Sequence, residues 1–271
     1  RLLFAVSALL LVATLTTACG SRSRELEPGT YRAILELPGG ELPFGLDVAQ
    51  EEQGMVLYLV NGEERVRVTD VTVAEGSLTA TMPGYENTLT AEIRGDKLTG
   101  EVSLLRAGGE RQVLPFRAEA GRTWRFFETP ATDNADVAGR WSVMFTTDQG
   151  KESPGIAEIT QSFERVTGTI LTPTGDHRFL AGEMRGDELH LSRFDGASAY
   201  LYKAKVDADG QLVGEYWSGK TGHQSFRGQR NPDAVLDVSG VATALKDPAV
   251  KLGLTFPDLD GQRVSLSDPK F

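Results

Sequence analysis

The chain has 271 residues, enough to bury a sizeable core and to form about one to three domains. Its net charge of −10 has the wrong sign for neutralising a phosphate backbone, and no basic stripe with interleaved aromatic residues occurs, so we expect no nucleic-acid partner. Hydrophobic residues make up 40% of the chain, it holds 30 glycines and helical periodicity is scarce, which together favour many short strands joined by glycine turns.

The N-terminal residues predict a secretory signal. Arg1 precedes an apolar run from Leu2 to Leu15, which is short for a membrane span of about 20 apolar residues. Small residues follow up to Cys19, so we expect a signal peptide over residues 1–19. A signal-anchor helix with an incidental cysteine is the alternative.

Cys19 is the one cysteine of this sequence, so no internal disulfide or Cys-x-x-Cys pair can form within it. The succession Thr16-Thr17-Ala18-Cys19 resembles the lipobox of bacterial lipoproteins, although Thr16 stands where Leu is commonest. The resemblance implies that Cys19 is lipidated and anchors the protein to a membrane on the periplasmic side of the bacterial cell envelope. Gly20 in place of Asp favours the outer membrane, and residues 20–28 are expected to form a polar tether.

A first β domain is expected over residues 29–127. Apolar and polar residues alternate from Tyr31 to Leu37, and turn residues such as Asn61-Gly62 separate this segment from later ones of the same kind. The later segments are Leu46–Ala49, Met55–Val60, Val66–Val73, Leu78–Met82, Leu89–Ile93, Leu98–Leu105 and Val113–Ala118. Their spacing predicts an antiparallel sandwich or up-and-down barrel. Residues 128–138 lack apolar periodicity and are expected to be a linker.

A second β domain of the same kind is expected over residues 139–230. Its predicted strands are Gly139–Phe145, Gly155–Thr160, Arg165–Thr172, Phe179–Met184, Glu188–Phe194, Ala199–Val206, Leu212–Trp217 and Gln224–Gly228. Gly29–Leu35 matches Gly139–Phe145, and Ile93–Leu98 matches Met184–Leu189, which indicates duplication of a small domain. A single large barrel is the alternative. Residues 231–251 are expected to be a connector, with a short helix at Val241–Lys246.

Two short motifs and the three histidines are candidate functional sites. Arg94-Gly95-Asp96 and Arg185-Gly186-Asp187 are typical of cell-adhesion loops, but Gly-Asp between two strands is also what a hairpin turn needs, and we predict turns. His177, His190 and His223 have no compact ligand spacing, so no metal site is predicted. We also predict no catalytic residue and no cofactor.

Aromatic residues gather in Phe194–Tyr202 and Gly214–Gly219. Inside a small barrel they either line a ligand pocket or fill the core, and core filling is the commoner use.

The last segment, residues 252–271, predicts a hairpin. Phe256-Pro257 opens an extended stretch, Asp260-Gly261 supplies a tight turn, and Val264 and Leu266 alternate with polar neighbours. This order resembles the first hairpin of redoxin domains, in particular the TlpA-like thiol-disulfide oxidoreductases and next the AhpC/TSA peroxiredoxins. Phe194–Tyr202 is also similar to the β region that precedes the redoxin domain in some TlpA-like lipoproteins. The resemblance implies an incomplete thioredoxin-like α/β domain, truncated before its Cys-x-x-Cys.

The resemblance further implies an extracytoplasmic, lipid-anchored thiol-disulfide oxidoreductase whose partners are protein disulfides or thiols, and whose present fragment is inactive. A peroxidatic redoxin, with a Thr-x-x-Cys, is a variant of this hypothesis. The alternative from a different class is a non-enzymatic β-barrel lipoprotein that binds an apolar ligand or a partner protein.

Overall fold

The computed structural model describes residues 24–106, 108–237 and 253–267. Every regular element within these ranges is a β-strand. They contain no helix that is long and apolar enough to cross a membrane. The chain divides into two compact units. Unit 1 comprises Arg1–Glu128 together with Arg193–Ala199, and unit 2 comprises Thr129–Ser192 with Tyr200–Phe271. The predicted signal peptide, Cys19 and the predicted helix at Val241–Lys246 lie outside the described residues.

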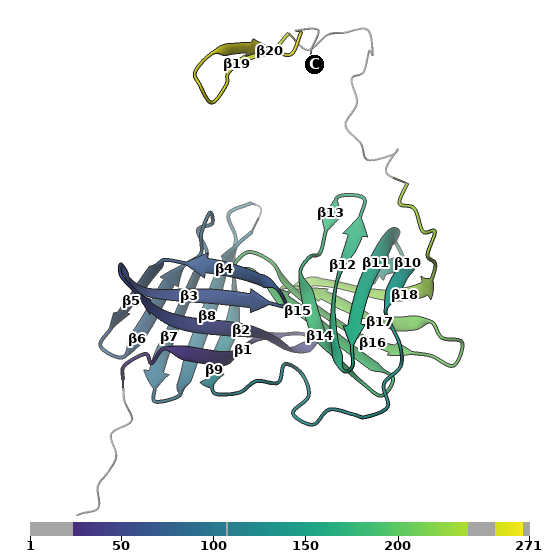
Figure 1. Cartoon of the computed structure of the whole chain (residues 1–271), viewed down its shortest axis with the longest axis horizontal. Helices are drawn as coiled ribbons and strands as arrows, with labels where there is room; N and C mark the ends of the chain where they lie inside the picture. Colours follow the sequence, from purple (N-terminus) through teal and green to yellow (C-terminus); the bar gives the residue numbers. More distant parts are fainter. Residues whose placement is uncertain (1–23, 107, 238–252, 268–271) are drawn as a thin grey trace, which may run out of the picture. The chain divides into compact units, whose positions relative to one another are not determined.

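Unit 1 is an antiparallel barrel (Figure 1). Its sheet has the order β4-β3-β2-β1-β9-β8-β7-β6-β5. The two edge strands, β4 and β5, are separated in the chain by Thr69 alone, so they are the halves of one bent strand and the sheet closes on itself. The strands are β1 (Gly29–Leu37), β2 (Gly40–Glu51), β3 (Gly54–Asn61), β4 (Glu64–Val68), β5 (Asp70–Ala74), β6 (Ser77–Thr81), β7 (Thr88–Arg94), β8 (Lys97–Leu105) and β9 (Arg111–Ala120).

The segment Arg193–Ala199 fills one end of the unit 1 core. The ring of Phe194 lies 5.0 Å from that of Phe44, and both side chains are buried. The buried amide of Asn61 donates to the Phe194 carbonyl at 2.8 Å and accepts from the Phe194 N–H at 3.1 Å. Asn87, also buried, donates to the carbonyl of Gly196 at 2.8 Å. The side-chain amides of Asn61 and Asn87 therefore pair with backbone groups of this segment, as a neighbouring strand does elsewhere in the barrel.

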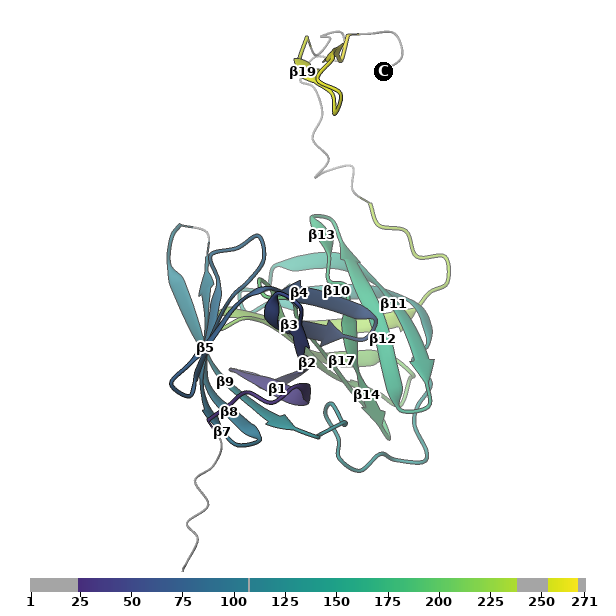
Figure 2. The same cartoon turned by 60° about the vertical axis from the view of Figure 1, so that its left-hand side comes forward.

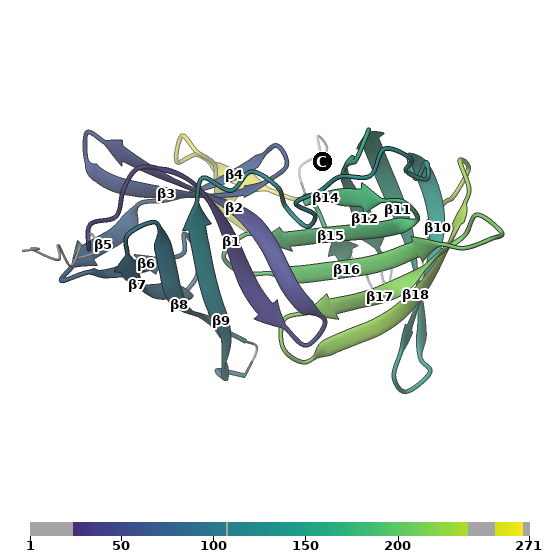
Figure 3. The same cartoon turned by 90° about the horizontal axis from the view of Figure 1, so that it is seen from below.

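Unit 2 is a second antiparallel barrel, seen from another side in Figure 2. The sheet order is β11-β10-β18-β17-β16-β15-β14-β12-β13, and an additional pairing of β11 with β12 closes the ring. Strands β15 to β18 run side by side in Figure 3. The strands are β10 (Gly139–Thr147), β11 (Glu152–Ser162), β12 (Arg165–Thr172), β13 (Gly175–Asp176), β14 (Leu180–Arg185), β15 (Glu188–Phe194), β16 (Ala199–Val206), β17 (Leu212–Ser218) and β18 (Gly222–Arg230).

The first strands of the two barrels play the same structural role. In unit 1 the hydroxyl of Tyr31 donates to the carbonyl of Glu27 at 2.9 Å, and in unit 2 the indole N–H of Trp141 donates to the carbonyl of Val137 at 2.9 Å. Both aromatic side chains are buried, and each reaches back four residues. The match between Gly29–Leu35 and Gly139–Phe145 is therefore structural as well as sequential.

The second internal match does not hold in the same way. Gly95 and Gly186 do occupy hairpin turns, with φ of 68° and 65°, as predicted for the two Arg-Gly-Asp motifs. However, the first turn joins β7 to β8 and is followed by two strands of its barrel, β8 and β9, whereas the second joins β14 to β15 and is followed by four, β15 to β18. The prediction that these turns lie at equivalent places in the two barrels is wrong, because different numbers of strands precede and follow them.

Two antiparallel β-barrels confirm the predicted fold class, but the redoxin resemblance is wrong. The C-terminal hairpin forms as expected from β19 (Thr255–Pro257) and β20 (Arg263–Ser265). Its apolar residues Leu254, Phe256 and Leu259 are nevertheless exposed, and no helix accompanies it in the described ranges. An Asp-Gly turn between alternating apolar and polar residues makes a hairpin in any β protein. The motif by itself is therefore no evidence for a thioredoxin-like domain or a TlpA-type oxidoreductase.

Candidate functional site

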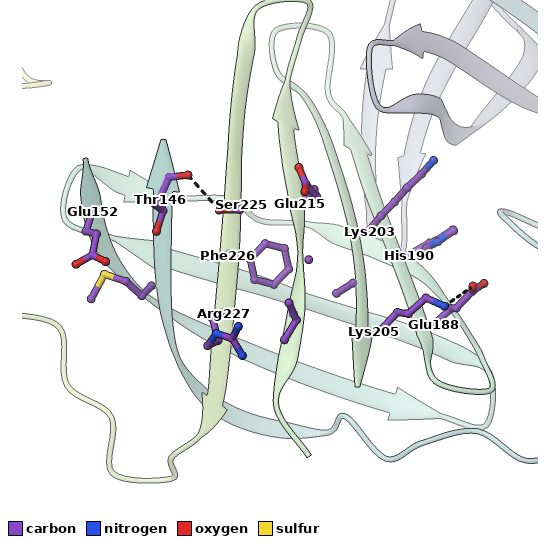
Figure 4. A pocket seen from close by; sticks show the side chains of 14 residues that line it. Thr146, Glu152, Glu188, His190, Lys203, Lys205, Glu215, Ser225, Phe226 and Arg227 are labelled. Atoms are coloured by element: carbon purple, nitrogen blue, oxygen red, sulfur yellow. Dashed lines mark hydrogen bonds and ion pairs between the residues drawn. The ribbon is translucent and has the colours of Figure 1, made fainter. Parts of the chain in front are cut away.

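A groove of about 590 Å³ crosses the outer face of unit 2, over β10, β11 and β15 to β18 (Figure 4). Because side chains alternate along a strand, neighbours of the buried Tyr202 and Phe226 point outward into it. Lys203 is one such neighbour, and Ser225 and Arg227 are two more. The core packing thus fixes which residues line the groove.

Charged side chains lie at both ends of this unit 2 groove and at its centre. Lys203, Lys205 and Glu188 lie toward one end and Glu152 toward the other, with Arg227 between them (Figure 4). The ammonium of Lys205 lies 3.2 Å from Glu188, whose pKa is lowered by hydrogen bonds from Arg185 first and then from Lys205. The groove therefore presents both signs of charge, suited to a ligand that carries both.

His190 contributes a neutral imidazole to the same groove. Its burial beside β16, and secondly the nearby ammonium of Lys203, lower the pKa of His190 from 6.5 to about 4. At neutral pH the ring is uncharged and has one N–H donor and one acceptor nitrogen.

His223 lies at the edge of the groove in a different setting. Its Nδ1 lies 2.7 Å from Asp148, its Nε2 contacts Glu215, and the ring stacks on Trp217 with centroids 5.5 Å apart. The contact with Glu215, followed by that with Asp148, raises the pKa of His223 above 6.5. Because Glu215 also lines the groove, its contact with His223 helps to hold one wall in place.

Apolar side chains also line the groove. Met144 on β10 points outward and is 40% exposed, between Pro154 on β11 and Arg227 on β18 in the strand register. Phe226 also borders the groove (Figure 4). Methionine is flexible and apolar, and side chains of this kind are common on surfaces that bind another chain.

Unit 1 carries the same arrangement at the same place. Ile34 on β1 lies between Pro43 on β2 and Arg117 on β9, as Met144 lies between Pro154 and Arg227. Yet Ile34 is only 4% exposed and Pro43 is also buried, although both are on the outer face. The corresponding surface of unit 1 is therefore covered.

The chain's own segment from Arg122 to Glu128 lies over this part of unit 1. Arg32 on β1 donates from Nε to the carbonyl of Arg125 at 2.9 Å, and its guanidinium stands 3.7 Å from the ring centroid of Trp124. Trp124 lines the remaining groove of about 370 Å³ together with Ile34 and Arg117. An extended segment with an aromatic residue is thus what occupies this position in unit 1.

The interior of unit 2, by contrast, is filled. Its void measures about 20 Å³ and is lined by core residues such as Val143, Leu189 and Leu212, which is space for about one water. Tyr202 is buried, its ring lies 4.5 Å from that of Tyr216, and its hydroxyl pairs with Nδ1 of His177 at 2.5 Å. Core filling by these aromatic residues is confirmed.

The three histidines considered as metal ligands lie in three separate settings: His177 on the core aromatic residues, His190 in the groove and His223 at its edge. Within the described ranges no group of three His, Cys, Asp or Glu side chains is placed to hold a metal ion. The groove residues Met144 and Arg227 were not predicted. Their only sequence signal is the alternation with core residues, which does not reveal strand register.

Comparisons with known proteins add little. No family model matches the chain, so no redoxin family model supports the resemblance of its last hairpin. No curated protein matches the chain either. Among solved structures it is similar to a protein of unknown function from the DUF3598 family of Nostoc punctiforme. The two share 13% identity over 76% of this chain and 96% of the other, with a TM-score of 0.27. A TM-score at that level carries no argument about fold or function.

Proposed function

We propose that this chain is a non-enzymatic binding protein whose unit 2 groove holds an extended segment of a partner protein. The observation that carries the proposal is the contrast between Met144 and Ile34. They occupy equivalent outer positions, but Ile34 is 4% exposed in a groove that it shares with Trp124 of its own chain, whereas Met144 is 40% exposed. The second barrel keeps free a surface that the first barrel covers.

The shape and charge of the groove define the occupant. It is an extended segment, because the groove runs across several strands rather than inward, and it carries an aromatic or large apolar residue to cover Met144. An acidic residue toward Lys203 and a basic residue toward Glu152 would complement the two ends. An apolar small molecule inside the barrel is not proposed, because the void of about 20 Å³ is too small for one.

Selection of peptides from a displayed library tests this proposal. Binders to the purified protein should share an aromatic residue with charges of opposite sign on its two sides. Met144→Asp should weaken them at least tenfold by placing a carboxylate against the aromatic side chain, a change of about 1.4 kcal/mol. Thr167→Asp, at another exposed outer position, on β12, is the matched control and should leave binding unchanged. Binders that ignore Met144→Asp would contradict the proposal.

We propose in addition that Cys19 carries the lipid anchor that holds the barrels at the bacterial envelope, on the periplasmic side. The support is the small-residue succession before Cys19 after an apolar run. Metabolic labelling with an alkyne fatty acid should mark the protein, and Cys19→Ser should abolish the label and release the protein into the soluble fraction. Labelling that persists in Cys19→Ser would contradict the anchor.

A further inference from the structure

Unit 1 has a sheet edge that its own strands leave open. Among the described residues, β5 pairs with β6 alone, and the neighbouring strand β3 pairs with the other half of the bent strand, β4, only from Leu57 onward. A groove of about 740 Å³ lies where β3 and β5 diverge, lined by Met55 on one side and by Val73 and Ala74 on the other. This site is separate from the unit 2 groove.

The hairpin geometry identifies the free backbone groups. β5 and β6 are joined by the two-residue turn Glu75-Gly76, with φ of 53° and 80°, so its closing pair, Ala74 and Ser77, is hydrogen-bonded. Pairs alternate along an antiparallel ladder, so Val71 and Val73 direct their N–H and C=O groups away from β6. Within the described ranges no strand pairing or loop hydrogen bond takes these groups up.

The same reasoning applies to the opposite wall. The pair Glu51 and Gly54 closes the β2–β3 turn, so the backbone groups of Met55 point away from β2, toward the groove. β4 ends its pairing at Leu57 and does not reach Met55. Backbone donors and acceptors that have no partner in the described part of the chain therefore face the groove from both sides.

β5 also lacks the features that protect edge strands. Its sequence from Asp70 to Ala74 contains no proline or lysine, and Val73 is 37% exposed. β-branched residues such as Val71, Thr72 and Val73 favour pairing with a further strand. An unprotected edge of this kind is the surface used in β-strand addition.

We infer that this groove binds an extended, basic segment of a partner protein as an added strand on β5. Among the described residues that line it, the carboxylates of Glu25 and Glu75 outnumber the one basic side chain, Arg24. The occupant is a single strand rather than a second copy of this chain, because Leu26, which is buried, and Met55 bound the other side. A second barrel would bring its own β6 into that wall.

The chain itself provides a precedent for filling a gap in this barrel. Segment Arg193–Ala199 belongs to unit 1. Hydrogen bonds hold it to Asn61, at the end of β3, and to Asn87, just before β7. That position is sealed by buried hydrogen bonds, whereas the described residues leave the β3–β5 gap unfilled.

The probe for this inference is the capped peptide Lys-Val-Thr-Val-Lys, titrated into the ¹⁵N-labelled protein. The amide signals of Val71, Val73 and Met55 should shift in a saturable way. Exchange of the Val71 and Val73 amides should slow about tenfold when the peptide is near ten times its dissociation constant. The peptide Lys-Val-Pro-Val-Lys, which cannot complete the ladder, should leave both unchanged. Absence of saturable shifts up to millimolar peptide would overturn the inference.

Val73→Pro removes one outward N–H and leaves the β6 pairing intact, so it should abolish peptide binding, while Val73→Thr should retain it. Peptide binding that survives Val73→Pro would overturn the inference. Light scattering could instead show that the full chain is a dimer and that Val73→Pro converts it to a monomer. That result would also overturn the inference, because the β5 edge would then bind a second copy of this chain.

Discussion

Replacing Trp124 with alanine should loosen the cover over unit 1. The Arg32 guanidinium stands 3.7 Å from the Trp124 ring centroid, and its side chain is only 9% exposed. A cation–π contact that is desolvated to this degree contributes about 1–2 kcal/mol. Loss of the half-buried indole removes about 1–2 kcal/mol of apolar burial as well. We expect Trp124→Ala to destabilise unit 1 by about 2–4 kcal/mol, since both contributions go together.

Hydrogen exchange measured by mass spectrometry resolves the two units, which a single unfolding curve does not. Peptides from β1 and β9 should exchange faster in Trp124→Ala, and those from β10 and β18 should not. Trp124→Phe is the conservative control. It keeps a ring over Arg32, and the buried indole nitrogen has no hydrogen-bond partner to lose. Equal protection of β1 in Trp124→Ala and wild type would refute the view that this segment covers Ile34.

Three further outcomes are expected. Asn61→Ala should destabilise unit 1 by about 2–5 kcal/mol in urea denaturation, because the N–H and C=O of Phe194 lose their buried partners; a loss under 1 kcal/mol would be inconsistent with that role. Gly182→Ala should lower the stability of unit 2, because its Cβ would lie 1.8 Å from the His190 carbonyl oxygen, whereas Gly253→Ala, with open space around it, should not. His223 is stabilised as the imidazolium, so its contribution should be complete below pH 6.5 and disappear as the pH rises through its higher folded-state pKa. His223→Gln should flatten the stability profile in that window, and an unchanged profile would argue against the Glu215 and Asp148 contacts.

The strands could be predicted because each obeys a local rule. Alternation marks β7 in the sequence Thr88–Arg94, and its burial alternates accordingly. The segment Val66–Val73 was predicted as one strand, and the structure bends it at Thr69 into β4 and β5. That bend closes the barrel, but it follows from the pairing of each half with a different neighbour, which no local pattern encodes.

The site could not be predicted for the same reason. Met144 and Arg227 are far apart in the sequence and become neighbours only through the β10–β18 register. Asn61 was expected to be a turn residue beside Gly62, but it is the last residue of β3, and its amide holds Phe194, more than a hundred residues away. The C-terminal hairpin shows the opposite error, because a correct local prediction was extended to a whole domain.

Site-specific photo-crosslinking tests the central claim most directly. A benzophenone amino acid placed at Met144, in the protein expressed in its native cells, should give one discrete adduct. Mass spectrometry should map that adduct to an extended segment with an aromatic residue in a single partner protein. The same amino acid at Thr167 should give none. Adducts of equal yield at both positions, or none at Met144, would contradict the claim that the unit 2 groove is a partner-binding site.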